Sequence, residues 1–433
     1  MLSHNFKNGS AYVFFRRLKF FTSLCFSYCK NFKLVKSFKN VNFYDFTNQQ
    51  NRLLSDILNY SKNNIPYYGS LIKNQQINEL NSVETLGKLP LLSKEIIRKE
   101  KSNMFPVNFN SVNYSNWKNT GGSTGEPLKF PMTENLEPLH QLCLYNLMRV
   151  RFSDLVVSFD GTRIDSEMLK RNIFWIENKF FDMYGKFHFS SLYLDDSNAN
   201  FYISKLNEIK PSVFRGYPSL ILKLAKYVEL NSVELNFNLK GIYLTSEFFD
   251  HEMMHFIGKI FNCHVFGQYG QTEATVFAFT QKNKLEYYCS PLYGYTEVLN
   301  EDGSHVSTNE IGEVVVTGFY NKCMPFIRYK TGDIAVYGGA KNGFVKLKSL
   351  QGRSVDFIYN VNNEKLYLVG LIFGGHLKAF NSIKSWQIIQ KVIGEVQIKI
   401  VTDNDFDTSH EKEIKEMLST NGVLSTIQYV DKI

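Results

Sequence analysis

Two short stretches of this 433-residue chain hold residue types whose spacing could support chemistry. In HEMMH, residues 251–255, His251 and His255 stand four apart with Glu252 between them. On a helix this spacing puts both imidazoles on one face, where they could bind Zn²⁺ while the glutamate acts as a general base. In NTGGSTGEPLKF, residues 119–130, glycines are mixed with hydroxyl side chains. The first stretch suggests a zinc peptidase, and the second suggests a polyphosphate site.

The glycine-rich stretch has the composition of an anion-binding loop. Glycines let backbone N–H groups close on a phosphate, and neighbouring hydroxyls add donors. The residues concerned are Thr120, Gly121, Gly122, Ser123, Thr124 and Gly125. The stretch is not a Walker A loop, because Glu126 stands where Gly-Lys would have to continue. Taken alone, a loop of this composition is more often a plain turn.

In the helix predicted around HEMMH, the two histidines do not lie on the buried face, where zinc ligands would be expected. Apolar residues share one stripe at helical spacing, namely Phe249, Met253, Phe256, Ile257 and Ile260. His251 and His255 fall nearly opposite this stripe, so we expect them to face solvent. Zinc ligands instead point into a cleft and are held by further hydrogen bonds. The only well-spaced acid for a third ligand, Glu273, belongs to another motif, so the pattern argues against a peptidase.

Alternating helices and strands must position these stretches. The sequence predicts helices between Phe46 and Arg98, with Ser93 as an N-cap and amphipathic spacing at Leu53, Leu54, Ile57 and Leu58. Runs such as LVVSFDG and LKGIYLTSEFFD then alternate with helical segments, which predicts an α/β sheet. From Leu285 to Leu350, short strands and glycine turns predict a β-rich subdomain. A further helix-and-strand segment follows.

The chain is too long for one ordinary core. We expect a large multi-layer α/β N-terminal domain over residues 45–350, with its β-rich subdomain at about 285–350. A small α+β C-terminal domain, acting as a lid, is expected over residues 351–433. Residues 1–44 form a separate basic, aromatic segment.

The basic segment supplies the whole net charge of +8. It holds eight basic residues and no acid, so the rest of the chain has 41 basic and 41 acidic residues and is neutral. A neutral body does not indicate a nucleic-acid partner. The segment itself could lie on an anionic membrane, or pack on its own domain with its cations in solvent. Six cysteines without a CxxC pair favour reduced thiols and a cytoplasmic protein, peripheral to the inner face of the membrane under the first alternative.

Eight stretches resemble motifs of the adenylate-forming (AMP-binding) ligases, and they follow one another along the chain in the family's order. NTGGSTGEPLKF resembles their phosphate loop, and NIPYYGSL with KLPLLSKEIIR resembles the N-terminal signature of the phenylacetate–CoA ligase family. FRGYPSL and YLTSE resemble that family's mid-domain elements. QYGQTE, IRYKTGD and QGRSVDF resemble, respectively, its tyrosine-glycine-x-threonine-glutamate motif, its ribose-binding aspartate motif and its interdomain hinge. The resemblance covers about residues 46–433 and is closest to the capsule-polysaccharide, CapK-type, branch.

This resemblance implies an ATP-dependent, AMP-forming carboxylate ligase that uses Mg²⁺ and transfers the acyl group to CoA. It also implies a role in capsule or surface polysaccharide biosynthesis. One alternative is an adenylating acyltransferase to a sugar or amine. Another is a non-catalytic nucleotide-binding scaffold, which Val355 favours because the hinge motif usually has an aspartate there. The small-molecule acid stays open, since Tyr145, Phe159 and Tyr217 could line an aryl or fatty pocket or belong to the core.

The resemblance also implies roles for single residues. Glu273 would hold Mg²⁺, which prefers oxygen ligands, and Thr272 and Lys129 would act at the phosphates. The residues of the glycine-rich stretch would hold the β- and γ-phosphates. Asp333 would accept the ribose hydroxyls, and Arg353 would reach the ribose or a phosphate. The adenine would be lined by Ser246, Glu247, Gln268 and Tyr269, and Gly270 would be a further cofactor-binding residue.

The end of the sequence, STIQYVDKI, resembles the strand that in this family precedes a proline-arginine-threonine-x-x-glycine-lysine loop. The lysine of that loop reaches the α-phosphate, and losing such a contact typically costs about 10²–10³ in rate. Lys432 stands too early in the pattern to be that lysine. We therefore expect a truncated C-terminal domain and slow formation of the acyl-adenylate.

Changing His251 and His255 together to alanine should leave the free energy of unfolding within about 0.5 kcal/mol of the unaltered protein, as is usual for exposed positions. Urea denaturation measures this change, and elemental analysis measures bound zinc. Stoichiometric zinc that disappears in the double variant would restore the peptidase hypothesis.

Overall fold

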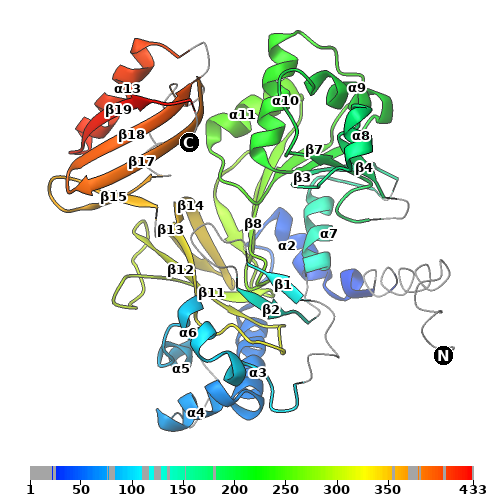
Figure 1. Cartoon of the computed structure of the whole chain (residues 1–433). Helices are drawn as coiled ribbons and strands as arrows, with labels where there is room; N and C mark the ends of the chain where they lie inside the picture. The colour runs from blue at the N-terminus through cyan, green and yellow to red at the C-terminus, as the bar shows by residue number, and fades with distance from the viewer. Residues whose placement is uncertain are drawn as a thin grey trace. The chain divides into compact units, whose positions relative to one another are not determined.

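The computed structural model forms two compact units (Figure 1). It describes residues 22, 26–75, 77, 83–109, 117–120, 128–133, 137–151, 153–178, 182–353, 356–368, 379, 382–402 and 406–431. Unit one comprises the described residues within Met1–Glu297, Val315–Lys330 and Gly338–Leu347. Unit two comprises those within Val298–Val314, Thr331–Tyr337 and Lys348–Ile433. The chain therefore passes between the units several times.

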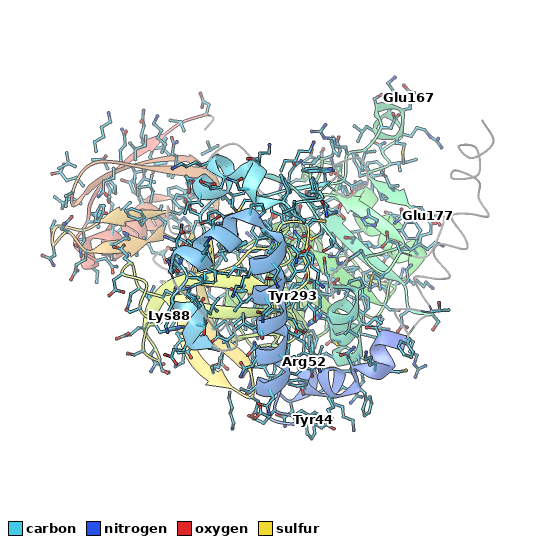
Figure 2. The ribbon with its side chains drawn as sticks, turned by 90° about the horizontal axis from the view of Figure 1, so that it is seen from below. Tyr44, Arg52, Lys88, Glu167, Glu177 and Tyr293 are labelled. Atoms are coloured by element: carbon cyan, nitrogen blue, oxygen red, sulfur yellow. The ribbon has the colours of Figure 1, made fainter. Side chains whose placement is uncertain are left out.

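Short helices occupy the N-terminal part of unit one, as the sequence predicts. They are α2 (Phe32–Lys39), α3 (Thr47–Asn64), α4 (Pro66–Asn74), α5 (Val83–Gly87), α6 (Lys94–Lys99) and the 3₁₀-helix η1 (Lys101–Met104). In α3, Leu54, Ile57 and Leu58 are buried, which follows from their amphipathic spacing. The predicted N-cap of α6 is confirmed, because Ser93 Oγ accepts a hydrogen bond from Ile96 N at 3.3 Å. Figure 2 labels Arg52 on α3 and Tyr44 in the segment just before this helix.

Helix α2 packs on unit one through its apolar face. Leu34, Val35 and Phe38 are buried, and the Phe38 ring stacks on Phe279 with a centroid distance of 3.8 Å. The lysines of α2 are exposed. This described part of the basic segment therefore packs on its own unit with its cations in solvent. No described helix is both long and apolar enough to cross a lipid bilayer.

The centre of unit one is a largely parallel sheet. Its parallel strands are β3 (Val156–Asp160), β5 (Phe187–Ser190), β6 (Val213–Gly216), β7 (Gly241–Leu244) and β8 (Val265–Gly270). Antiparallel partners extend it at β4 (Trp175–Glu177), β9 (Phe277–Thr280) and β10 (Tyr287–Cys289). The helices that alternate with these strands are α7 (Glu137–Leu147), α8 (Ser166–Lys170), α9 (Ala199–Ile209), α10 (Pro218–Leu230) and α11 (His251–Ile260). The predicted α/β fold class is confirmed.

The segment expected to be β-rich forms strands that continue the same sheet. They are β11 (Gly294–Leu299), β12 (Ile311–Gly318), β13 (Tyr329–Lys341) and β14 (Phe344–Arg353). The complete order is β11-β12-β13-β14-β10-β9-β8-β7-β6-β3-β5-β4. Strands β13 and β14 are longer than the short strands expected, because the pair Gly338–Gly339, typical of a turn, lies inside β13. A separate hairpin is formed by β1 (Trp117–Asn119) and β2 (Lys129–Pro131).

Unit two contains a small α+β core. Two antiparallel strands, β17 (Ile383–Val392) and β18 (Glu395–Thr402), are joined by β19 (Leu424–Tyr429), which runs parallel to β18. Helix α13 (Thr408–Thr420) buries Ile414 and Leu418 against this sheet, and Asp407 caps its first turn. A further hairpin pairs β15 (Phe357–Tyr359) with β16 (Lys365–Tyr367). The expected class of the C-terminal domain is therefore observed.

A buried ion pair joins distant segments of unit one. Arg328 donates from Nη2 and Nε to the Glu297 carboxylate at 3.1 and 3.3 Å, and both side chains are buried. Its Nη1 also donates to Gly87 O at 2.9 Å and Leu89 O at 2.7 Å. This one guanidinium therefore holds β11, the segment before β13 and the loop after α5.

Arg328→Met should lower the free energy of unfolding of unit one by about 3–5 kcal/mol, because the Glu297 carboxylate stays buried without its cation. Urea denaturation measures the change. Lys259→Met is the matched control, because it breaks an exposed pair with Glu229, and exposed pairs contribute about 0–1 kcal/mol. Equal effects of the two substitutions would contradict a structural role for the buried pair.

Candidate active site

Several predicted site residues follow the carboxyl ends of neighbouring parallel strands. Strand β7 ends at Leu244 and is followed by Ser246 and Glu247, while β8 ends with Gln268, Tyr269 and Gly270. Leu244 pairs with Gly267 across these strands, so the two groups are adjacent. Parallel α/β sheets bind ligands at this edge. The structure thus brings together the four residues predicted for adenine and the predicted cofactor-binding residue Gly270.

The end of β6 approaches β3 closely at this edge. Gly216 ends β6 with φ of +131°, and a Cβ there would lie 1.9 Å from Phe159 O. A larger residue would therefore push the two strands apart. The glycine of FRGYPSL is thus required for the sheet edge to form as observed.

The adenine candidates differ in the hydrogen bonds that they already make within the protein. Glu247 Oε2 accepts a hydrogen bond from Ser219 N, at the start of α10, at 3.0 Å, so this carboxylate also stabilises a helix end. Ser246 is exposed, with φ of +73°. Gln268 Oε1 is buried, and no donor reaches it within the described structure. A buried acceptor without a donor is costly, and an amino group of a bound base would satisfy it.

The turn after β8 buries the predicted metal ligand. Glu273 is 6% exposed, and its Oε1 accepts a hydrogen bond from the Tyr329 hydroxyl at 2.8 Å. A carboxylate that accepts this bond has further lone pairs available, so the donor set fits a hard cation such as Mg²⁺. Thr272, beside it, is exposed. The motifs did not predict this contact of Tyr329 with Glu273.

The β1–β2 hairpin holds the two ends of the predicted phosphate loop. Thr120 N donates to Leu128 O at 3.0 Å, and Leu128 N donates to Thr120 Oγ1 at 2.9 Å. Thr120 is therefore buried at the base of the loop with its hydroxyl proton still available to donate. Lys129 is exposed, with Nζ 5.6 Å from the centroid of the Trp117 ring. Five predicted residues lie outside the described residues, namely Gly121, Gly122, Ser123, Thr124 and Gly125.

Aromatic rings connect this hairpin with the Glu273 turn. The Phe130 ring contacts Phe326 edge to face, with centroids 5.2 Å apart, and Phe326 contacts Tyr329 at 5.0 Å. Tyr329 in turn donates to Glu273. Edge-to-face pairs of this kind restrict ring orientation. The predicted phosphate and metal elements are thus linked through the segment that contains Arg328.

The two remaining predicted residues lie in unit two and contact each other there. Arg353 Nε lies 3.0 Å from Asp333 Oδ1. The backbone of Asp333 is also fixed, because Asp333 N donates a hydrogen bond to Thr331 Oγ1 at 2.9 Å. The resemblance assigned both side chains to the nucleotide, but it did not predict that they form an ion pair. The hinge residue Val355 lies outside the described residues.

The HEMMH segment forms helix α11, and its histidines behave as predicted. His251 and His255 are both exposed. The buried positions of the helix are Met254 and Ile257, so Met253, which was expected in the apolar stripe, is only partly buried. Asp250 caps the helix by accepting a hydrogen bond from Met253 N at 2.7 Å. Among the described residues, no group of three or more His, Cys, Asp or Glu side chains could hold a metal ion.

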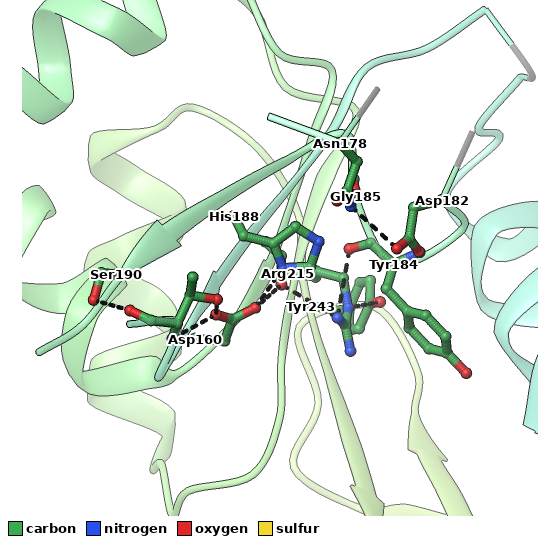
Figure 3. A network of polar contacts seen from close by, with 11 residues as sticks. Asp160, Asn178, Asp182, Tyr184, Gly185, His188, Ser190, Arg215 and Tyr243 are labelled. Atoms are coloured by element: carbon green, nitrogen blue, oxygen red, sulfur yellow. Dashed lines mark hydrogen bonds and ion pairs between the residues drawn. The ribbon is translucent and has the colours of Figure 1, made fainter. Parts of the chain in front are cut away.

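A second group of polar side chains crosses the sheet and was missed by sequence analysis (Figure 3). His188 in β5, Ser158 in β3, Arg215 in β6 and Tyr243 in β7 are neighbours in register, and we call them the polar row. Register neighbours share one face of a sheet. Helix α7 meets this face through Gln141, whose Nε2 donates to Tyr243 Oη at 2.7 Å.

One end of the polar row is a hydrogen-bonded pair with shifted proton affinities. His188 Nδ1 lies 2.7 Å from Asp160 Oδ2, which also accepts from Ser158 Oγ at 2.9 Å. Although burial opposes it, hydrogen bonding by His188, Thr162 and Ser158 lowers the pKa of Asp160 to about 2. The hydrogen bond to Asp160 raises the pKa of His188. The pair therefore favours an imidazolium beside a carboxylate.

Two family models and one curated relative match the sequence. The AMP-binding enzyme model matches residues 120–321, and the CapK C-terminal domain model matches residues 361–433. Protein CapK of Staphylococcus aureus is 27% identical over 407 residues, which cover 90% of this chain and 86% of the relative. The predicted adenylate-forming ligase superfamily and the predicted similarity to CapK are therefore confirmed.

Solved structures share the fold at low identity. 2-Hydroxyisobutyryl-CoA ligase, in the postadenylation state in complex with R3-HIB-AMP, matches with a TM-score of 0.67 and 16% identity, covering 88% of this chain and 85% of that chain. The acyl acid amido synthetase AtGH3.15, in complex with 2,4-DB, matches with a TM-score of 0.57 and 14% identity, covering 92% and 88%. The chain belongs to the adenylate-forming ligase superfamily, and it combines an AMP-binding enzyme domain with a CapK C-terminal domain.

Proposed function

We propose that this chain is an ATP-dependent, AMP-forming carboxylate ligase of the phenylacetate–CoA ligase type. The observation that carries the proposal is the buried Glu273 carboxylate, held by Tyr329 at the sheet edge that also presents the unpartnered Gln268 Oε1. One group suits a metal ion that accompanies a nucleotide, and the other suits a base that donates a hydrogen bond.

The proposed reaction joins a small carboxylic acid to AMP. A carboxylate oxygen of the acid attacks the α-phosphorus of ATP, the bond to the β-phosphate oxygen breaks, and pyrophosphate leaves. Mg²⁺, when bound, neutralises phosphate charge that would otherwise repel the attacking carboxylate. The chain's part is to hold the two reactants in line and away from water.

Each motif residue then has a proposed task. Glu273 holds Mg²⁺ with Thr272 beside it, while Thr120 and Lys129 contact the phosphates with the loop residues 121–125. Motif resemblance alone supports Asp333 as the ribose acceptor and Arg353 as its neighbour at the ribose or phosphate. The adenine is proposed to contact Ser246, Glu247, Gln268 and Tyr269, with Gly270 as a further cofactor-binding residue.

We propose CoA thiol as the acyl acceptor, with a sugar or an amine as the alternative. The fold is shared by a CoA ligase and by an acyl acid amido synthetase, so both outcomes have precedent among similar structures. Release of AMP that requires CoA supports the first, and release that requires an amine or a sugar supports the second. Similarity to CapK, together with the motif resemblance, supports a role in capsule or surface polysaccharide biosynthesis.

Glu273→Gln should lower acyl-adenylate formation by about 10²–10³, because a neutral amide replaces the charged metal ligand. Pyrophosphate release, scanned over a panel of carboxylic acids with ATP and Mg²⁺, measures the effect. Glu252→Gln serves as the control, since this glutamate is exposed on α11. A Glu273→Gln protein with unchanged pyrophosphate release and unchanged Mg²⁺ dependence would rule out the proposed metal site.

We also propose that the basic segment touches anionic membranes at the cytoplasmic side. Its support is the exposure of aromatic and basic side chains together, with Phe26 73%, Phe32 51% and Phe43 59% exposed. Such side chains favour an anionic interface, where each nearby lysine contributes about 1 kcal/mol.

Replacing the exposed lysines of α2 by glutamate should weaken binding to phosphatidylserine vesicles at least about tenfold. The variant carries K33E, K36E and K39E, and co-sedimentation measures binding. The control carries K62E, K73E and K88E, which are also exposed and give the same net charge. Equal loss of binding in both variants would show a nonspecific charge effect and would reject the proposed contact.

A further inference from the structure

Arg215, in the polar row, is a guanidinium without a carboxylate partner. Its Nε donates to the Tyr243 hydroxyl, and its Nη1 lies 3.2 Å from Ser158 Oγ and 3.4 Å from Tyr184 O. The rings of Tyr184 and Tyr243 lie 4.9 and 5.3 Å from its carbon Cζ. Within the described ranges, no carboxylate reaches ion-pair distance of Arg215, and no acceptor contacts its Nη2.

The carboxylates near the Arg215 guanidinium already interact with other groups of the protein. Asp160 pairs with His188 at 2.7 Å. Asp182 accepts from Asn178 Nδ2 at 3.1 Å and from Tyr184 N at 2.8 Å. Burial raises the pKa of the Tyr184 hydroxyl, and the nearby Glu137 carboxylate raises it further; Glu137 also has a partner of its own. The protein therefore surrounds Arg215 with hydroxyls, a carbonyl and aromatic faces, but these groups do not neutralise its charge.

A second donor beside Arg215 is also unpartnered. His188 Nδ1 is used by Asp160, and His188 Nε2 is buried without a hydrogen-bond partner in the described structure. Because Ser158 lies between His188 and Arg215 in register, the imidazole and the guanidinium flank one position of the sheet. Figure 3 shows His188 and Arg215 side by side, with the Tyr184 ring next to the guanidinium. An anion with two oxygens could accept from both groups.

The location of these two donors relative to Gln268 suggests which ligand reaches them. Tyr243 pairs with Phe266, and Gln268 is two residues further along β8, so it shares the face of the polar row. Two residues of a strand span about 7 Å. A group held at the strand ends beside Gln268 would therefore have the polar row next to it, deeper along the same face.

We propose that Arg215 and His188 bind a second acidic group on the carboxylic acid substrate, so that the acid activated by this chain is a short dicarboxylic acid. The proposal rests on the proposed function, since it assigns the substrate class of the same site. An aryl or fatty acid would leave both donors unpaired, and two of the aromatic candidates for its pocket, Tyr145 and Phe159, are buried at 7% and 0% exposure. Tyr145 is further fixed by a hydrogen bond from its hydroxyl to Met183 O.

The first test compares pairs of acids of equal chain length. Short straight-chain dicarboxylic acids should be activated with a kcat/KM about 10²-fold higher than the matching monocarboxylic acids, because the latter leave the cation and the imidazole unpaired. Arg215→Met should remove this preference by lowering kcat/KM for the dicarboxylic acids alone. Arg215→Lys should keep part of it, since the charge remains but the paired donors do not.

The second test measures binding without the reaction. Short dicarboxylic acids, added alone, should raise the Tm of the unaltered protein and of Arg171→Met, an exposed-arginine control, but should not raise the Tm of Arg215→Met. Circular dichroism of each variant before addition checks that it is folded. Dicarboxylic acids that stabilise the protein through Arg215, even where no pyrophosphate is released, would support the site while rejecting the proposed ligase.

Three results would overturn the inference. One is pyrophosphate release that favours monocarboxylic acids in the unaltered protein, in which case the ligase function stands and the substrate class is wrong. Another is the absence of both a rate preference and a Tm increase with every dicarboxylic acid. Dicarboxylic acids that stabilise Arg215→Met as much as the unaltered protein would likewise reject Arg215 as the binding group.

Discussion

The buried pair of Arg328 and Glu297 is the interaction on which the candidate site of unit one depends. Arg328 sits next to Tyr329, so the carboxylate and carbonyls that hold the guanidinium also hold the segment that reaches Glu273. Phe326, two residues before Arg328, contacts Phe130 of the β1–β2 hairpin, so the pair also restrains the position of this hairpin. Positioning to within fractions of an ångström needs such rigid support, because a misplaced reacting group loses most of its rate advantage.

Arg328 and Arg215 differ in the partners that surround their guanidinium groups. Arg328 meets a bidentate carboxylate and two carbonyls, so its charge is neutralised by the fold. Arg215 meets two hydroxyls, a carbonyl and two ring faces, and the described residues bring no anion to it. Burying a cation in this second way costs stability, and proteins accept such costs mainly where a ligand completes the site. The difference lies in the partners and would not be visible from either arginine alone.

The sequence was sufficient for features that depend on local spacing and insufficient for those that depend on distant pairing. Helical periodicity located Leu54 and Ile57 on the buried face of α3 and put His255 in solvent, because side-chain direction along a helix follows from residue number. Motif order located Gln268 and Glu273 at a strand end. Periodicity gives the face of a residue but not its partner, so the contacts of Arg328 and Arg215, which bridge separate strands, could not be predicted.

The ion pair of Asp333 and Arg353 is more exposed to solvent than the buried pair of Arg328 and Glu297 in unit one. The Arg353 side chain is 38% exposed and that of Asp333 14%, so water screens the attraction. Pairs of this kind contribute about 0–1 kcal/mol. Replacing the guanidinium by another donor to the Asp333 carboxylate therefore costs little free energy. The same exchange at Glu297 would leave a buried carboxylate without the Arg328 cation. A carboxylate proposed to bind ribose hydroxyls needs a partner that it can release, and Arg353 meets this requirement.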